Sequence, residues 1–359
     1  MLPYVPLVIL ALSVLVFIHE FGHFIVARAF GMRVQVFSIG LGPVLWQWRP
    51  KGSETVYQVC LVPLLAYVKI AGMSPQDPVD PTDRGSYQNA SALGRFFAIA
   101  AGPLANYLAA SAIVFGLLFF GGVTHPPDYR RVAATVSGVM PSMPADRAGV
   151  RPGDTIVRVG ETPTPTWESL LTAMTASQGR PQTLEIRRGG STVRLQVTPQ
   201  MNSARTRFVI GVEPPRGTVE KLPLGRAARE AMLIPAWQTV EQVKGFARMI
   251  SGRERPQVMG PVKIVAEAAR AAEYGIKAAM EVFAAISLAL FFFNLLPVPA
   301  LDGGRLVFLA YELIVRRKVP ANIETPATTV SIVLLLGMGA VIFMFESYEV
   351  IFKRIFGLS

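Results

Sequence analysis

The sequence is poor in cysteine and in charged residues. Cys60 is its single cysteine, which excludes a disulfide framework and any zinc site built from several thiolates. Charged residues make up 16% of the 359 positions, whereas soluble domains usually carry about 25%. With 51% hydrophobic residues the chain is also too apolar to be fully disordered. These shortages exclude an ordinary soluble domain and favour a membrane protein.

The charge that is present is mostly positive, with 35 Lys and Arg against 24 Asp and Glu. A net charge of +11 is compatible with nucleic-acid binding. In an apolar chain, however, it is more typical of loops that face anionic lipid headgroups. We therefore expect the lipid bilayer as a partner and no nucleic acid.

Four apolar runs are long enough to cross a bilayer, which takes about 20 residues of helix. No Lys or Arg precedes the first run, so it lacks the positive segment of a signal peptide and is predicted to be a retained helix. The predicted membrane helices are residues 3–27, 96–121, 282–301 and 327–346.

Basic residues concentrate in two connecting loops, residues 28–95 and 303–325. With four membrane helices these loops lie on the same side, which the positive-inside rule assigns to the cytoplasm. Both termini and the long segment between the second and third helices are then extracytoplasmic. The prediction is a multi-pass protein of the cytoplasmic membrane.

Residues 132–213 differ in character, with short apolar runs separated by Gly, Pro and Arg. A helix is predicted at 166–176, with Thr166 as its N-cap. The run 144–161 (PADRAGVRPGDTIVRVGE) resembles the helix, Gly-Asp turn and strand of a PDZ domain. Such a domain binds an extended peptide by strand addition; the alternative is a spacer or steric cap with an empty groove. The predicted strands are 134–139, 155–159, 183–187, 192–197 and 208–212.

In residues 226–279, apolar side chains recur at helical spacing with polar residues between them. This pattern predicts an amphipathic helix on the membrane surface. The alternative is a helix packed on the domain at 132–213. Gly and Pro within 253–261 predict a loop that leads into the third membrane helix. The apolar positions are Leu233, Trp237, Val240, Val243, Ala247 and Ile250.

The first apolar run contains the sequence His19-Glu20-Phe21-Gly22-His23, an H-E-x-x-H motif. On a helix, positions i and i+4 share a face, so both imidazoles can bind one metal ion, with Glu20 beside the metal-bound water as a general base. Ionisable groups inside a membrane helix are costly and mark function. The alternative is two histidines packed against other helices. His125, the third histidine of the chain, is interpreted as a surface residue.

A catalytic zinc site typically has three protein ligands and an open water position. Asp302 is the candidate third ligand, because a carboxylate is the usual companion of H-E-x-x-H. Pro297 and Pro299 precede it and interrupt the helix, and two glycines follow it. The alternative is that Asp302 caps a helix at the cytoplasmic interface.

Taken together, these motifs resemble the site-2 protease family of intramembrane zinc metalloproteases. The resemblance rests on H-E-F-G-H in the first helix, N-x-x-P-x-P-x-L-D-G-G at 294–304 and the PDZ-like segment. It is closest to the bacterial PDZ-containing branch that cleaves membrane-spanning anti-sigma factors and remnant signal peptides. The resemblance implies zinc bound by His19, His23 and Asp302, with Glu20 as the base. It also implies that Asn106 and Asn294 contact substrate or stabilise the oxyanion.

After the first helix the pattern becomes strand-like, and residues 34–72 are predicted to form a small sheet. We expect Ile39, Gly40 and Leu41 to lie on an open edge that pairs with an unwound substrate segment. The alternative is a structural sheet whose edge is already covered by protein.

The predicted fold is a polytopic α-helical membrane protein with four transmembrane helices, a membrane-associated β-hairpin or sheet and an inserted α+β PDZ domain. Its predicted parts are residues 1–121, 132–213, 226–279 and 280–359.

The predicted function is zinc-dependent hydrolysis of peptide bonds in or near the transmembrane segments of single-span proteins. One alternative is a catalytically silent membrane adaptor that uses the PDZ domain. Another is a metal transporter, which would need polar residues in several membrane helices, and the second and fourth helices offer few.

Overall fold

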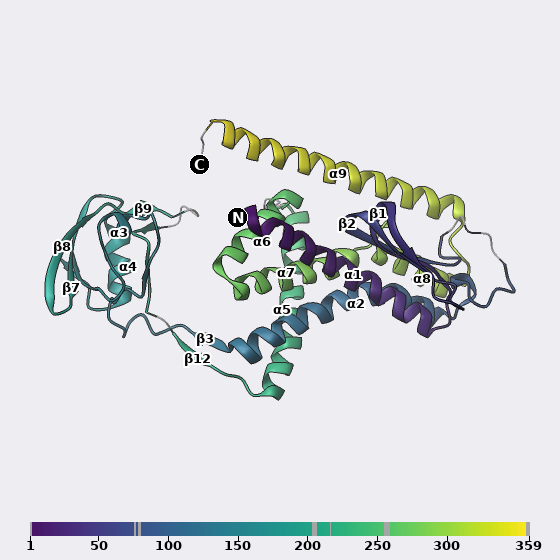
Figure 1. Cartoon of the computed structure of the whole chain (residues 1–359), viewed down its shortest axis with the longest axis horizontal. Coiled ribbons are helices and arrows are strands. Elements are labelled where there is room, and N and C mark those ends of the chain that lie inside the picture. The colour runs from purple at the N-terminus through teal and green to yellow at the C-terminus, as the bar shows by residue number, and fades with distance from the viewer. Residues whose placement is uncertain are drawn as a thin grey trace. The chain divides into compact units, whose positions relative to one another are not determined.

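A computed structural model describes residues 2–356 except 75–76, 78–79, 203–206, 216 and 255–258. The chain divides into two compact units, which are described separately. One unit combines Met1–Gly121 with Pro223–Ser359, and the other is Gly122–Leu222 (Figure 1).

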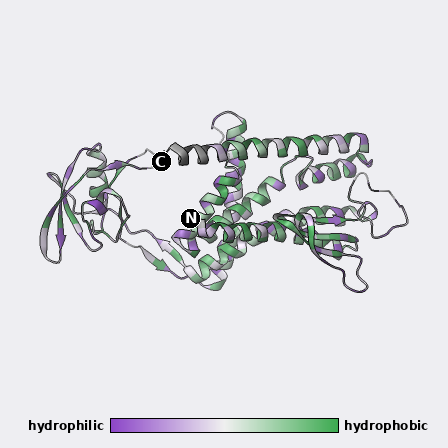
Figure 2. Ribbon diagram, turned by 45° about the horizontal axis from the view of Figure 1, so that its top comes forward, coloured by the Kyte–Doolittle hydropathy of each residue, from purple (hydrophilic) through white to green (hydrophobic). Residues whose placement is uncertain are grey.

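Four helices of the first unit are long and apolar enough to cross a membrane, as predicted. Figure 2 shows them as mostly hydrophobic ribbons. The third runs over residues 276–294, so the prediction of 282–301 is displaced. It ends before Pro297 because the residue preceding a proline is disfavoured in α conformation. The four are α1 (Val5–Ala29), α2 (Ala92–Gly116, prolonged to Gly121), α7 (Ile276–Asn294) and α9 (Ala321–Phe356).

Helix α2 lies between α1 and α7, and small residues allow the close approach to α1. A Cβ atom on Gly22 would overlap the Ala101 carbonyl group and the Ala105 side chain. Close contact through small residues is how helices associate where lipid removes the hydrophobic drive. This packing brings the middle of α2 against the H-E-x-x-H segment of α1.

Three further helices complete this unit: α5 (Leu224–Ile250), α6 (Pro261–Tyr274) and α8 (Asp302–Val315). The sequence predicts that the loop at 253–261 leads directly into the third membrane helix, and this is wrong because α6 intervenes. Pro261 occupies the first turn of α6, where its missing N–H is not needed. Residues 255–258 of that loop lie outside the described residues.

The apolar stripe predicted for α5 is exposed in this unit, with Trp237 64% exposed. The opposite side of α5, including Ala227 and Ala231, is buried, and α5 packs on α2. The C-terminal half of α9 contacts the start of α6 through Glu346. The Glu346 carboxylate accepts hydrogen bonds from the backbone N–H groups of Gly260 and Val262 (2.8 and 3.2 Å).

Strands β1 (Val34–Trp48) and β2 (Val56–Ile70) form the predicted sheet of this unit. Residues 36–39 of β1 have partners on both sides, namely residues 66–69 and residues 56–59 of β2. The chain therefore folds β2 around the first half of β1. Among the described residues, no further strand pairs with residues 66–70, so this segment forms an open edge.

The second unit is an α+β domain built on a four-stranded sheet of order β6-β5-β7-β8. Ile156, Leu170, Leu184 and Ile186 form the centre of its core. The strands of the sheet are β5 (Thr155–Val159), β6 (Thr162–Pro163), β7 (Gln182–Arg188) and β8 (Ser191–Val197), and the helices are α3 (Pro144–Arg147) and α4 (Trp167–Ala176).

The remaining described strands of this unit are short and form three separate pairs. In helix α4, Thr166 is the N-cap as predicted, because its side chain accepts a hydrogen bond from the Ser169 N–H. The predicted strands 134–139 and 208–212 are only partly formed, since Gly211 (φ +80°) interrupts the latter. The short pairs are β3 (Val123–His125) with β12 (Thr218–Glu220), β4 (Gly138–Val139) with β11 (Val212–Glu213), and β9 (Gln200–Met201) with β10 (Phe208–Val209).

Candidate metal centre

Helix α1 presents His19 and His23 on one face, as their spacing of four residues requires. Both side chains are buried, and their Nε2 atoms lie 3.2 Å apart. The two rings are nearly perpendicular, at 82°. Their facing nitrogen atoms therefore converge on one point beside the helix.

Asp302 completes this group from the first turn of α8. Its Oδ2 atom lies 3.2 Å from His19 Nε2 and 3.3 Å from His23 Nε2. Leu301 is the N-cap residue of α8 and no side chain caps that end, so the geometry does not support the capping alternative for Asp302.

The glycines after Asp302 allow the chain to fold back at this point. A Cβ atom on Gly303 would overlap the Leu295 and Leu296 carbonyl groups, and one on Gly304 would overlap the Val298 carbonyl group. The turn at 295–301 can therefore pack directly on the start of α8. This close approach delivers Asp302 to the two histidines.

The three donor atoms fit a tetrahedral zinc ion. Zinc–nitrogen and zinc–oxygen bonds of about 2.0–2.1 Å place tetrahedral ligand atoms about 3.3 Å apart, and the observed separations are 3.2, 3.2 and 3.3 Å. Asp302 Oδ2 is buried and has no hydrogen-bond partner among the described residues. Three protein ligands leave one tetrahedral position open, as in catalytic zinc sites.

The ionisation of Asp302 suits a metal ligand. Burial raises the pKa of its carboxyl group, but the two adjacent imidazoles lower it by more, so the pKa lies well below its usual range. The carboxyl group is therefore ionised at neutral pH, as metal binding requires.

Helix α2 supports both imidazoles from behind. The backbone oxygen of Ala98 lies 2.7 Å from His23 Nδ1, and the side-chain amide of Asn106 lies 3.1 Å from His19 Nδ1. Gly102 lies between them, and a Cβ atom there would overlap the His23 ring. Positions 98, 102 and 106 are four residues apart and therefore form one stripe of α2 that faces the histidines.

Glu20 lies in a cavity of about 240 Å³ together with the three ligand residues. The other residues that line this cavity include Tyr67, Val68 and Ile70 of β2, Asn294 at the end of α7, and Arg305 of α8. The site therefore combines a metal-binding group, a second carboxylate that is not one of the three ligands, and an open sheet edge.

The other residues singled out in the sequence lie in different places. Asn294 lines the cavity and donates a hydrogen bond to the Leu290 carbonyl oxygen (2.9 Å). Asn106 has no exposed surface and does not line the cavity.

The predicted edge residues Ile39, Gly40 and Leu41 do not line the cavity. Ile39 is paired on both sides, with Ala66 and Val59, so it offers no open edge. The edge beside the site belongs to residues 66–70 of β2, and the assignment to 39–41 is corrected accordingly. The strand pattern could not reveal this, because it does not say which half of β1 becomes central.

Arg305 and Tyr67 line the cavity and were missed in the sequence. Arg305 follows Asp302 by three residues on α8, so helical spacing could have placed it near the site. Tyr67 lies in the predicted strand region 34–72, but strand periodicity alone does not place it at the site.

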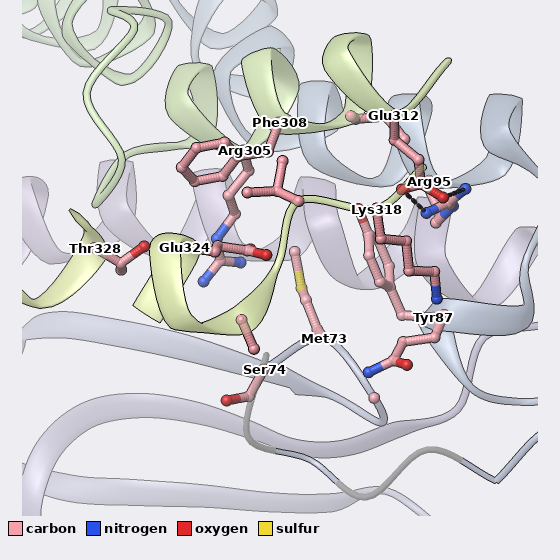
Figure 3. A pocket seen from close by; sticks show the side chains of 15 residues that line it. Met73, Ser74, Tyr87, Arg95, Arg305, Phe308, Glu312, Lys318, Glu324 and Thr328 are labelled. Carbon is pink, nitrogen blue, oxygen red and sulfur yellow. Dashed lines mark hydrogen bonds and ion pairs between the residues drawn. The ribbon is translucent and has the colours of Figure 1, made fainter. Parts of the chain in front are cut away.

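A second cavity, of about 310 Å³, adjoins the first and shares Arg305 and Met73 with it (Figure 3). Arg95 and Glu312 form a two-fold ion pair in this cavity (2.8 and 3.1 Å), and Arg305 lies next to Glu324. Burial raises the pKa of Tyr87 in its wall to about 12. Charged side chains of the second cavity therefore lie next to the cavity that contains the metal-ligand group.

Comparison with known proteins supplies the family. Residues 7–338 match peptidase family M50. The chain belongs to this family. The site-2 protease family inferred from the motifs is thereby confirmed, as are the peptidase class and zinc as the metal.

Relatives of the M50 peptidase cover nearly its whole length. A protein of Nostoc sp. is 32% identical over 95% of both chains, and one of Rickettsia conorii is 32% identical over 94% of both. A protein of Clostridium perfringens is 30% identical over 93% of this chain and 96% of its own. All three have names that assign them provisionally as zinc metalloproteases.

Proposed function

We propose that this M50 peptidase hydrolyses peptide bonds within or next to the transmembrane segments of single-span membrane proteins. The observation that supports this most is the position of the metal-ligand group. Two ligands and Glu20 lie on a helix long and apolar enough to span the membrane, and Glu20 shares a cavity with all three ligands. A soluble peptidase has no reason to place its base on such a helix.

His19, His23 and Asp302 would hold the zinc ion. Zinc held there would polarise a scissile carbonyl group and lower the pKa of a water molecule. Glu20 is the residue placed to accept a proton from water and to deliver it to the leaving amine nitrogen. Asn294, from its place in the cavity wall, is proposed to hydrogen-bond the substrate.

The open edge of β2 is proposed to hold the substrate backbone. A helical substrate hides its carbonyl groups in its own hydrogen bonds, so it must unwind before attack. Residues 66–70 pair with β1 on one side, and no described strand pairs with their other side. Tyr67, Val68 and Ile70 of this segment line the cavity. Strand addition there would satisfy the unwound segment and place it beside Glu20.

The α+β unit at 122–222 is proposed to be a PDZ domain on the extracytoplasmic side, with both termini also outside. Its helix, Gly-Asp turn and strand at 144–159 and its helix α4 support this. It would exclude substrates whose outer domain has not been trimmed, or bind a peptide ligand. Anti-sigma factors and remnant signal peptides are the proposed substrate classes.

The adaptor alternative receives no support from the site. A protein that only holds partners has no need of three converging ligands with Glu20 beside them. A metal transporter would need a polar path through several membrane helices, whereas these polar side chains gather at one point.

Purified full-length protein in detergent, incubated with a panel of single-span substrates, tests the proposal. We expect cleavage within or near the membrane segment, loss of cleavage with a chelator, and recovery when zinc is restored. Glu20→Gln protein is the matched inactive control. Cleavage that survives complete zinc removal, or that Glu20→Gln protein also performs, would contradict the proposal.

A further inference from the structure

Asn106 is a fully buried polar residue in the middle of α2, with 0% of its surface exposed. Its side-chain amide nitrogen lies 3.1 Å from His19 Nδ1, and its Oδ1 atom has no hydrogen-bond partner among the described residues. A buried amide oxygen without a partner is costly. The contact with His19 therefore needs an explanation beyond packing.

The metal decides which atoms of this contact carry hydrogen. When His19 Nε2 binds zinc, the proton of the neutral imidazole resides on Nδ1, which must then donate. An amide N–H group facing it would place two donors together. A half-turn of the amide exchanges its nitrogen and oxygen with almost no change in shape. Oδ1 then accepts the hydrogen bond from His19 Nδ1–H, and the amide nitrogen takes the position that Oδ1 leaves.

The backbone around Asn106 is held in place for this contact. The hydroxyl group of Ser287 on α7 donates to the Asn106 carbonyl oxygen (2.8 Å), and Ser287 is itself fully buried. One turn earlier on α2, Gly102 allows the His23 ring to approach, and two turns earlier the Ala98 carbonyl oxygen faces His23 Nδ1.

We infer that Asn106 is a positioning residue for the zinc centre, whose side-chain oxygen fixes the tautomer and the ring orientation of His19. Helix α2 then supplies one acceptor for each histidine ligand: a side chain for His19 and a backbone carbonyl group for His23. This role replaces the contact with substrate or oxyanion expected from the resemblance, because a residue with no exposed surface cannot touch a substrate in the cavity. The inference rests on zinc being the metal of the proposed function.

The test is a zinc-affinity measurement on full-length protein, made by competition with a chelator of known affinity and without substrate. Asn106→Leu keeps the branching at Cγ but removes the acceptor, and we expect it to weaken zinc binding about 10–100-fold. Asn106→Asp retains an oxygen acceptor, so it should bind zinc with near-wild-type affinity and more tightly than Asn106→Leu. Ser111→Ala, another buried polar position on α2, is the control and should leave zinc affinity unchanged.

Thermal unfolding of the zinc-free variants guards against a folding defect, since a positioning role predicts that Asn106→Leu loses zinc affinity while its zinc-free form still unfolds cooperatively. The inference is overturned if Asn106→Leu binds zinc like wild type, or if Asn106→Asp and Asn106→Leu lose it equally. If Asn106 instead contacted the substrate, both variants would have a raised KM at saturating zinc and an unaltered zinc affinity, and this result would also overturn the inference. Since zinc binding is measured without substrate, failure of the proposed proteolysis would be seen separately.

Discussion

Two aspartates, one in each unit, show how a structural carboxylate differs from a metal ligand. Asp154 is 1% exposed, and both of its oxygen atoms accept hydrogen bonds from Arg188 at 2.7 Å, with a third from the Arg151 N–H at 2.8 Å. Asp302 Oδ2 is also buried but faces two imidazole nitrogens and has no hydrogen-bond partner in the described part of the chain. A fully satisfied carboxylate stabilises its surroundings, whereas an unsatisfied one beside two histidines is arranged for a ligand.

The same contrast separates the two units. In residues 122–222 the core is apolar, and the buried carboxylate of Asp154 is neutralised by Arg188. In the unit that contains the four membrane helices, His19 and His23 are buried side by side without a packing reason for two polar side chains at one point. Substitutions at these groups should therefore have different consequences in the two units.

Glu20→Gln is expected to reduce cleavage about 10²–10⁴-fold, the usual contribution of a general base. The substitution is nearly isosteric and leaves the three ligands in place, so zinc content should not change. Rates on a single-span substrate, measured together with metal analysis, check this. Cleavage near the wild-type rate with full zinc would remove Glu20 from the mechanism.

Asp302→Asn and Asp154→Asn form a matched pair. A neutral amide is a poor zinc ligand, so Asp302→Asn should lose zinc affinity by more than the roughly 10–100-fold typical of changes in the hydrogen-bond partners of a ligand. Activity should fall in parallel. Asp154→Asn should keep zinc and activity but lower the stability of residues 122–222 by about 2 kcal/mol, because charged hydrogen bonds to Arg188 are weakened.

Metal analysis after dialysis, and hydrogen exchange in β5 and β7, separate these two outcomes. Full zinc occupancy in Asp302→Asn would make that residue structural and erase the contrast between the aspartates.

Acid should weaken the second unit through Asp154. Burial raises the pKa of its carboxyl group, but the hydrogen bonds from Arg188 and Arg151 lower it by more, so the folded-state pKa lies below its unfolded value of about 3.9. The associated stability is therefore complete above about pH 4 and is lost as the pH falls through the folded-state pKa. Hydrogen exchange of β7 amides from pH 6 to pH 3 should show this loss in wild type and much less of it in Asp154→Asn. Equal pH dependence in both proteins would exclude Asp154 as its source.

Proline in the open sheet edge is expected to have the smallest effect. Successive residues of a strand direct their N–H groups to opposite sides, so one of Tyr67→Pro and Val68→Pro should remove an outward N–H group. Loss of one substrate hydrogen bond of about 0.5–1.5 kcal/mol corresponds to a reduction of about 2–10-fold in kcat/KM, with zinc retained. Ile39→Pro is the contrasting variant. It should disrupt the sheet because Ile39 is paired on both sides. Normal kcat/KM in both edge variants would rule out strand addition there.

The metal ligands could be found in the sequence because their signals are local. The spacing of His19 and His23 fixes their common face on any helix, and Asp302 follows prolines that end the preceding helix. The four apolar helices could also be predicted from the sequence, because the length of a membrane helix follows from the thickness of the bilayer. Helix α6 was missed because Gly and Pro at 253–261 were interpreted as a loop that continues to the third membrane helix.

The membrane class, the H-E-x-x-H motif and its carboxylate partner could be predicted from the residues alone, because each depends on composition or on local spacing. The folded chain was needed to show that residues 66–70, and not 39–41, form the open edge at the site. Strand periodicity is the same for central and edge strands, so it carries no information on pairing. The place of Asn106 was decided in the same way. Whether a polar side chain on α2 faces a substrate or the back of a histidine depends on how α2 packs against α1, and Gly22 and Gly102 set that distance through contacts far apart in the chain.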